Sequence, residues 1–315
     1  MSRYFFKRFF LLFPTIFIVS IFVFSIVRFI PGDIVEIMAS EQGYGYDAEE
    51  MREILGLDQP VHTQYFDYIY NIFRFGDFGY SLWSGEAITK ELADRLPVSA
   101  QLGIMALFFT ICTGVPIGVI SALKQDTALD YILRSYTIGG LSVPGFWLAV
   151  MFLTFSALWF QWVPPMKYVP FTESPLGSFK QMITPAFLMS IAMSAGIMRM
   201  TRTMMLEVMR EDYIRTAKAK GLNYWTVVFR HALKNAMIPV VTIIGMQVTL
   251  IVGGTVIMES IFSLPGMGRY LLGAIQQRDY PVIQGVNLII CSVIITMNLL
   301  VDLTYGYLDP RIRYQ

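Results

Sequence analysis

Six long stretches without a charged side chain dominate the pattern of hydrophobic and polar positions along the chain. An α-helix rises about 1.5 Å per residue, so about 20 apolar residues cross the hydrocarbon core of a bilayer. Each stretch is close to that length or longer. We therefore predict an all-α polytopic membrane protein, with six transmembrane helices within residues 9–27, 98–123, 135–166, 181–198, 235–258 and 280–301.

Polar residues between the first two stretches predict a small helical domain at 29–97, outside the membrane. Asp47 and Glu50 have the spacing of a capping box, and Gly56 suits the end of the short helix that follows. Pro60 begins a second predicted helix. Its apolar stripe has helical spacing and consists of Val61, Tyr65, Tyr68, Ile69 and Ile72. The domain is either a cap over the outer mouth or a surface that meets a substrate-delivering partner, and its acidity favours the cap.

A polar, mostly basic segment at 211–239 separates the fourth stretch from the fifth. Residues 212–220 predict a short helix, which Gly221 can end in the left-handed conformation because it has no Cβ. Ala217 and Gly221 lie four residues apart, so we expect a small-residue face that a partner can approach closely. Aromatic side chains, which are typical of interfaces, flank it at Tyr213, Tyr224, Trp225 and Phe229. We interpret the segment as a docking helix; the alternative is charge that only orients the protein in the membrane.

The loop between the fifth and sixth stretches contains another short helix. Pro265, Gly266 and Gly268 predict a tight turn. An apolar stripe at 271–275 then predicts an interfacial helix that ends near Asp279. Such a segment either dips into the outer mouth as a gate or is an ordinary connector, and the pattern alone favours neither.

Composition supports the membrane assignment and charge orients it. Of the 315 residues 55% are hydrophobic and the mean hydropathy is +0.54, more apolar surface than a soluble domain can bury. Lysine and arginine gather on the side that holds both chain ends and the 199–234 segment. The positive-inside rule therefore predicts a multi-pass protein of the cytoplasmic membrane with both termini cytoplasmic. Arg28 follows the first stretch in place of a small-residue cleavage site, which favours a retained helix over a signal peptide.

The chain lacks the residues that membrane enzymes and ion-coupled carriers usually need. Two histidines and two cysteines are too few and too scattered for a metal site or a catalytic arrangement, and no G-x-x-x-x-G-K-[ST] motif occurs. The uncharged stretches also lack the ionisable group that an ion-coupled transporter keeps at membrane depth. Their deepest polar residues are Gln247, Asn287 and Asn298, for which hydrogen bonding between helices is favoured over lining a pore.

Residues 211–239 resemble the coupling region of permease subunits of binding-protein-dependent ABC transporters, in the dipeptide/oligopeptide/nickel branch. That branch carries R-T-A-x-A-K-G and then R-H-A-L-x-N-A-x-x-P, and the chain reads RTAKAKG at 215–221 and RHALKNAMIP at 230–239. The glutamate of the wider superfamily's E-A-A-x-x-x-G is Arg215 here, so no glutamate contact is implied. Further matches extend along nearly the whole chain: PGD at 31–33, LGLDQP at 55–60, GDFGYS at 76–81, RLP at 95–97, PGMG at 265–268 and LDPRIR at 308–313.

The resemblance implies a non-enzymatic pore subunit of an ATP-driven importer. Its partners would be a homologous second permease, two cytoplasmic ATPase subunits that bind ATP and Mg, an extracytoplasmic solute-binding protein and membrane lipid, with no nucleic acid. This chain would bind no cofactor and no metal. Di- or oligopeptides are the favoured substrates, with nickel chelates or oligosaccharides as the alternative and an ion-coupled secondary transporter less favoured.

The resemblance also assigns domains and site residues. Residues 1–28 would form the cytoplasmic N-terminus and first helix, and residues 98–315 a five-helix permease core with a coupling helix at about 211–221. ATPase coupling would fall to Asp212, Tyr213, Arg215, Thr216, Ala217, Ala219, Lys220 and Gly221. The outer gate or mouth would consist of Phe262, Pro265, Gly266, Met267 and Gly268.

Overall fold

The computed structural model describes residues 2–29, 35, 49, 52, 57–165 and 167–308. Within these residues the protein is all-α, apart from an isolated bridge between Tyr80 and Ala87. The predicted capping box at Asp47 and Glu50, the PGD motif at 31–33 and most of the tail at 308–313 lie outside the described residues. The fold class is that of an all-α polytopic membrane protein.

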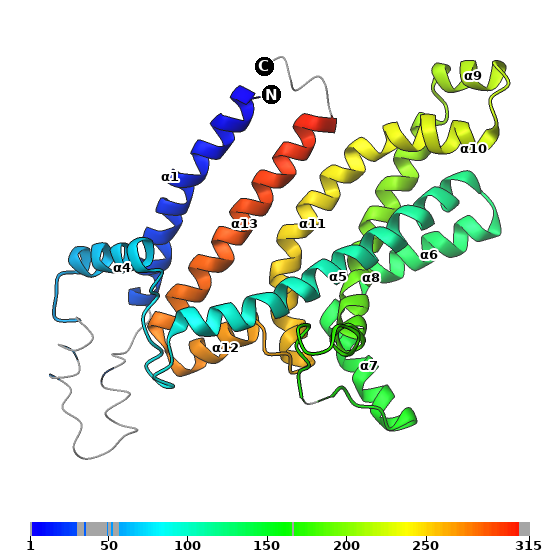
Figure 1. Cartoon of the computed structure of the whole chain (residues 1–315). Helices are drawn as coiled ribbons and strands as arrows, with labels where there is room; N and C mark the ends of the chain where they lie inside the picture. Colours follow the sequence, from blue (N-terminus) through cyan, green and yellow to red (C-terminus); the bar gives the residue numbers. More distant parts are fainter. Residues whose placement is uncertain are drawn as a thin grey trace.

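In the part of the chain that the structure describes, five helices are long and apolar enough to cross a membrane, and they correspond to five of the six predicted stretches (Figure 1). They are α1 (Ser2–Ile26), α5 (Ile88–Leu123), α8 (Pro175–Val208), α11 (Lys234–Ile261) and α13 (Tyr280–Leu308). A short 3-10 helix, η1 (Val27–Phe29), continues α1. The length of each charge-free stretch therefore predicted these spans correctly.

The third predicted stretch differs, because 135–166 is not one helix. Its residues fall in α6 (Ala128–Ser142) and α7 (Gly145–Phe160), whose axes are bent by 98°. Pro144 explains the break: it disfavours helical backbone at the preceding residue, and Val143 is extended with φ −99° and ψ 123°. By length and composition the pair is either a sixth, broken span or a re-entrant loop.

The predicted domain boundary at residue 97 falls within a helix, and the division into domains stays a prediction. The stripe at 88–96 and the second stretch form one 36-residue helix, α5, with Pro97 inside it. Before it, α4 (Val61–Phe75) begins after Pro60, as predicted, and ends at Gly76, which has φ +64°, the left-handed conformation that commonly ends a helix. The hydroxyl groups of Tyr65 and Ser20 are 2.8 Å apart, and this hydrogen bond holds α4 against α1 at one edge of the bundle (Figure 1).

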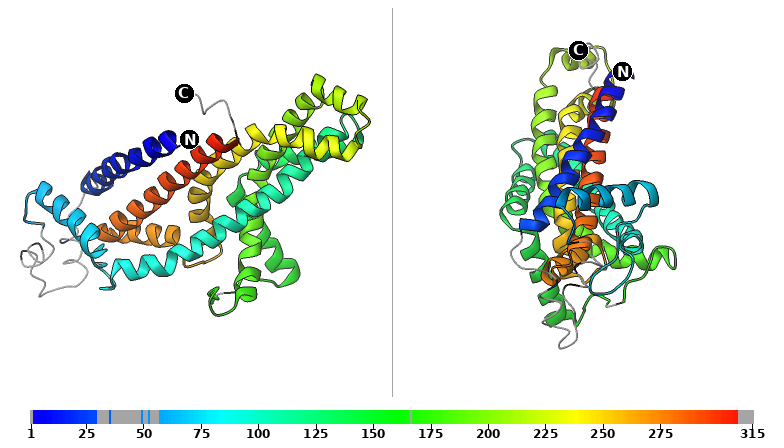
Figure 2. Two further views of the ribbon diagram at one scale, coloured as in Figure 1. Left: turned by 45° about the horizontal axis from the view of Figure 1, so that its top comes forward. Right: turned by 90° about the vertical axis from the view of Figure 1, so that its left-hand side faces the viewer.

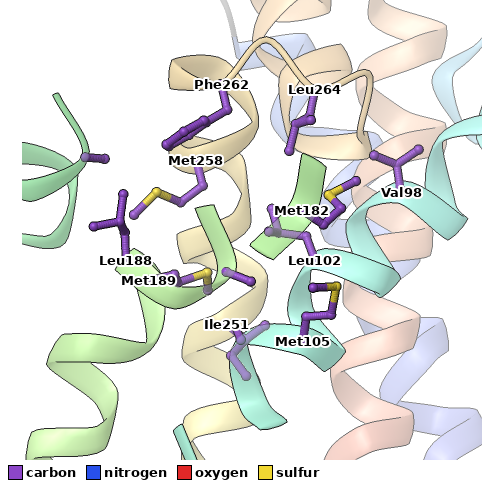
Figure 3. Close-up of a cluster of buried hydrophobic side chains, with 13 residues drawn as sticks. Val98, Leu102, Met105, Met182, Leu188, Met189, Ile251, Met258, Phe262 and Leu264 are labelled. Carbon is purple, nitrogen blue, oxygen red and sulfur yellow. The ribbon is translucent and has the colours of Figure 1, made fainter. Parts of the chain in front are cut away.

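The core of the bundle lies where α5 crosses α8. Gly118 lets the two backbones approach, because a Cβ there would lie 2.7 Å from the carbonyl oxygen of Met198. Towards the other end of these helices, a cluster of buried side chains joins α5, α8 and α11 (Figure 3). The labelled members are Val98, Leu102, Met105, Met182, Leu188, Met189, Ile251, Met258, Phe262 and Leu264.

The remaining short helices lie at opposite ends of the bundle. Figures 1 and 2 show α9 (Asp212–Ala219) and α10 (Tyr224–Thr226) at the same end as the start of α1 and the end of α13. The π-helix η2 (Val227–Leu233) connects α10 to α11. At the other end α12 (Met267–Gln277) lies between α11 and α13 in sequence and packs against both. The two candidate sites are therefore at opposite ends of α11.

Candidate functional site

The predicted docking helix is present as α9. It spans Asp212–Ala219, and Gly221 follows with φ +75°, in the left-handed region that favours glycine. The Gly221 amide donates to the carbonyl oxygen of Lys218 at 3.0 Å. A Cβ on Gly221 would meet open space, so backbone conformation rather than close approach requires glycine here. The sequence prediction of this helix and its end is confirmed.

The inner face of α9 packs on the chain itself. Ile214 is fully buried and Ala217 is buried one turn later, in a cluster built from α5, α8, η2 and α11. The cluster consists of Val119, Ala122, Met205, Ile214, Ala217, Val227, Val228, Ala232 and Ala236. The expectation that Ala217 shares an exposed face with Gly221 is therefore wrong. Its small side chain brings α9 close to its own bundle, whereas Ala219 and Gly221 are exposed.

The outer face of this segment carries exposed polar and aromatic side chains. Asp212, Tyr213, Arg215, Thr216 and Lys220 are all exposed, and an ion pair of 3.1 Å joins Arg215 to Asp212. These five positions are available to a partner, as the docking interpretation requires.

Aromatic rings extend the exposed surface beyond α9. Trp225 is 57% exposed and Phe229 55% exposed, and their rings stack with centroids 5.7 Å apart. The Tyr224 ring packs edge-on against Trp225. Stacked rings left in solvent beside charged groups are typical of a protein-binding surface. We call Tyr213, Tyr224, Trp225 and Phe229 the aromatic surface.

A hydrogen-bonded joint connects α9 to the start of α11. The RHAL residues at 230–233 lie in the π-helix η2, a form of helix that is often found at functional sites. The Asn235 side-chain amide donates to the Tyr213 hydroxyl at 2.8 Å and to the carbonyl oxygen of His231 at 2.9 Å. Asn235 therefore fixes the relative positions of α9 and α11, a role that the sequence motif alone did not indicate.

At the opposite end, the predicted gate residues lie together around the start of α12. Phe262, Gly266, Met267 and Gly268 are buried, and Pro265 is half-buried. Their neighbour Glu259 is a charged residue with no exposed surface. Glu259 was missed as a site residue from sequence, because the groups that bond its carboxylate lie on α5 and in the first turn of α12, and the pattern does not bring these together.

The far end of α12 is tied to the domain that precedes α5. The Trp83 indole donates to the carbonyl oxygen of Gln277 at 2.8 Å, and the Ser81 hydroxyl donates to the Asp279 carboxylate at 2.6 Å. The Arg95 guanidinium lies over the Tyr270 ring, 4.2 Å from its centroid. Burial raises the pKa of Tyr270 to about 12, so the ring stays neutral at physiological pH. The helix is held at both ends and along its side.

The three polar residues considered for a pore have different surroundings. Asn298 accepts a hydrogen bond of 3.1 Å from the Thr249 hydroxyl, which joins α13 to α11 in the manner expected of interhelical bonding. The Asn287 amide instead donates to its own helix, to the carbonyl oxygen of Ile283 at 2.8 Å. Gln247 lies near Gly196 of α8 and makes no side-chain hydrogen bond within the described residues. A pore-lining role for these residues stays a prediction.

A buried ion pair near the α9 end was missed from sequence. The Arg202 guanidinium on α8 donates to both carboxylate oxygens of Asp130 on α6, at 2.9 and 2.7 Å, and the Ser121 hydroxyl of α5 donates to the same group. Asp130 has no exposed surface. Thr127 caps α6 three residues before Asp130, and this capping-box spacing was the sequence signal that could have drawn attention to Asp130. The pair joins three helices beneath the docking segment.

Among the groups of histidine, cysteine, aspartate and glutamate in the described residues, none has an arrangement that could hold a metal ion. The predicted absence of a metal and of a bound cofactor in the whole chain stays a prediction.

Comparison with protein families gives two matches that together cover most of the chain. The model of the binding-protein-dependent transport system inner membrane component matches residues 114–314. The model of the N-terminal part of such membrane components matches residues 1–103. Both candidate sites lie within the first match.

Similar proteins extend over the full length. The dipeptide transport system permease protein DppB of Escherichia coli K12 is 39% identical over 339 residues, covering all of both chains. A di/tripeptide permease of Pseudomonas aeruginosa is 38% identical over 98% of both chains. A putative peptide transport system permease of Brucella abortus is 39% identical over 96% of both chains.

Among solved structures, an inward-facing form of the MetNI methionine ABC transporter matches with a TM-score of 0.56. The identity is 16%, and the match covers 70% of this chain and 97% of that one. At that identity the likeness supports the fold alone.

Proposed function

The chain belongs to the family of binding-protein-dependent transport system inner membrane components, and from that premise we propose that it is the pore-forming permease subunit of an ATP-driven importer of di- or oligopeptides. The observation that supports peptides as the substrate is the full-length similarity, at 38–39% identity, to permeases named for dipeptide and di/tripeptide transport. The absence of charged residues from all six apolar stretches also suits the transport of peptides with varied side chains.

The aromatic surface and the outer face of α9 are the proposed docking site for a cytoplasmic ATPase subunit. Exposed Trp225 and Phe229 provide apolar area at low entropic cost, and Arg215 and Lys220 provide charge at its border. Two such subunits would serve this chain and a homologous second permease. ATP and Mg would be bound by those subunits, and this chain would perform no bond chemistry.

The proposed orientation places α9 and both chain ends in the cytoplasm. The family is one of inner membrane components, and the helices are suited to a multi-pass protein. Basic residues concentrate in the 199–234 segment, which the positive-inside rule places in the cytoplasm. The α12 end then faces outward, where an extracytoplasmic solute-binding protein would deliver substrate.

The packing of α9 supports a mechanical role. Ile214 and Ala217 are buried against α5, α8 and η2, so a push on α9 is passed to several helices together. Closure of the ATPase pair around ATP would displace α9 and shift the pore between inward- and outward-facing forms. The movement needs no flexible linker between the docking surface and the bundle.

Three measurements test this proposal. The tagged permease should co-purify with an ATPase, and the purified complex in proteoliposomes should accumulate a labelled dipeptide only with ATP and its solute-binding protein present. Competition then identifies the substrate class: unlabelled di- or oligopeptides should abolish uptake, while nickel chelates and oligosaccharides should not. Preferential transport of a nickel chelate or an oligosaccharide would replace the peptide assignment while leaving the permease assignment intact.

A further inference from the structure

A buried glutamate connects the outer end of α11 to the start of α12. The Ser99 hydroxyl of α5 donates to one carboxylate oxygen of Glu259 at 2.6 Å. The backbone amides of Gly268 and Arg269 donate to the other oxygen, at 2.8 and 3.0 Å. The amide of Met267 donates to the Ser99 hydroxyl at 2.8 Å. One carboxylate and one hydroxyl thus satisfy the first three amides of α12.

The surrounding backbone is shaped to admit this carboxylate. A Cβ on Gly266 would collide with the Glu259 carboxyl group, and a Cβ on Gly268 would lie 2.5 Å from the Cα of Val256. The positive end of the α12 dipole also favours a negative group at that position. The two glycines of the PGMG motif therefore permit two close contacts: Gly266 with the glutamate side chain and Gly268 with the α11 backbone.

Glu259 lies at the opposite end of a continuous helical path from the docking segment. Residues Tyr224–Ile261 form one candidate span, through α10, η2 and α11. Asn235 fixes the inner end of that path to α9, and Glu259 fixes its outer end to α12. A displacement of the inner end of this path is therefore passed to α12 through α11 itself.

We propose that Glu259 is the positioning residue that couples α11 to the outer gate, holding the start of α12 closed until the docking segment moves. The inference rests on the proposed function, since it assumes that ATPase subunits displace α9. When α11 shifts relative to α5, Ser99 and the α12 amides cannot all keep their bonds to one carboxylate. The buried residues Phe262 and Met267 are then released together with the start of α12.

We call the hydrogen bonds that join Glu259 to Ser99, Gly268 and Arg269 the latch. Glu259→Gln tests the latch in the complete transporter in proteoliposomes. The amide nitrogen of glutamine cannot accept a hydrogen bond, so the variant loses either the bond from Ser99 or the two bonds from Gly268 and Arg269. Uptake per ATP hydrolysed should therefore fall by about tenfold, within the usual range of coupling effects. Ser99→Ala, a milder change, should lower the same ratio by about threefold. Glu86→Gln is the matched control, because Glu86 pairs with Lys90 on the exposed surface at the same end and should leave the ratio unchanged.

A second readout does not depend on the substrate. Met267 is 2% exposed, so Met267→Cys, in a background lacking Cys112 and Cys291, should react with a membrane-impermeant thiol reagent only when ATP drives the gate open. With Glu259→Gln added, the thiol should react without ATP.

The outcomes separate the two proposals. An unchanged ratio in the assembled Glu259→Gln complex, with labelling that still requires ATP, would overturn the latch. If that variant does not assemble, the ratio and labelling of Ser99→Ala decide in the same way. A purely structural role would lower uptake and ATP hydrolysis together and leave their ratio constant. Wild-type complex without peptide uptake would contradict the proposed function instead, and the labelling would still report on the latch.

Discussion

Replacing Trp225 by alanine should weaken the binding of an ATPase subunit without unfolding the permease. Trp225 is 57% exposed, and its ring stacks on Phe229, which is 55% exposed. Aromatic side chains bury about 150–250 Å² in full, so about 100 Å² of Trp225 is available to a partner. At about 25 cal/mol per Å², that area is worth about 2.5 kcal/mol. This corresponds to an increase in Kd of about sixtyfold.

The assay is a titration of the detergent-solubilised permease pair with the fluorescently labelled ATPase, with Kd read from anisotropy. Phe73→Ala is the control, because Phe73 is 79% exposed on α4 at the opposite end of the bundle. It should leave Kd unchanged. The docking surface would be refuted by a Kd for Trp225→Ala within twofold of the wild-type value, with both proteins folded to the same extent.

Further predictions concern the ion pair beneath the docking segment and the glycine after α9. Asp130→Ala leaves the Arg202 guanidinium without its buried partner, so unfolding should be easier by about 3–5 kcal/mol, seen as a lower Tm in detergent. Adding Arg202→Met should recover much of that loss, and failure to do so would argue against an unpaired charge as the cause. Gly221→Val places a β-branched residue at φ +75°, which costs about 1–2 kcal/mol and should distort the end of α9. ATP hydrolysis should then be uncoupled from uptake with membrane insertion intact, and normal uptake per ATP would contradict the coupling role.

Sequence pattern predicted those elements that depend on neighbouring residues. The start of α4 was expected after Pro60 and the end of α9 at Gly221, because both signals depend on the local sequence alone. The spans followed from the length of uncharged stretches, which measures whether a helix can cross a bilayer. The length of an uncharged stretch does not show whether its helix is straight, however, so the bend at Val143 was missed.

The features that the sequence pattern missed depend on tertiary contacts. Spacing placed Ala217 and Gly221 on one face but could not tell which face of α9 turns towards the bundle. Asp130 and Arg202 are 72 residues apart, and nothing local pairs them. Glu259 and Ser99 are separated by 160 residues and meet only because α5 passes beside the end of α11. Such contacts depend on the packing of helices that the pattern identifies singly.

The measurement that tests the central claim most directly is peptide uptake by proteoliposomes with and without the ATPase subunits. The permease pair, the solute-binding protein and a labelled dipeptide are kept constant, and only the ATPases and ATP are varied. The account predicts accumulation against a gradient with the complete complex and none after the ATPase subunits are removed. Accumulation that persists without them, driven by an ion gradient, would contradict it.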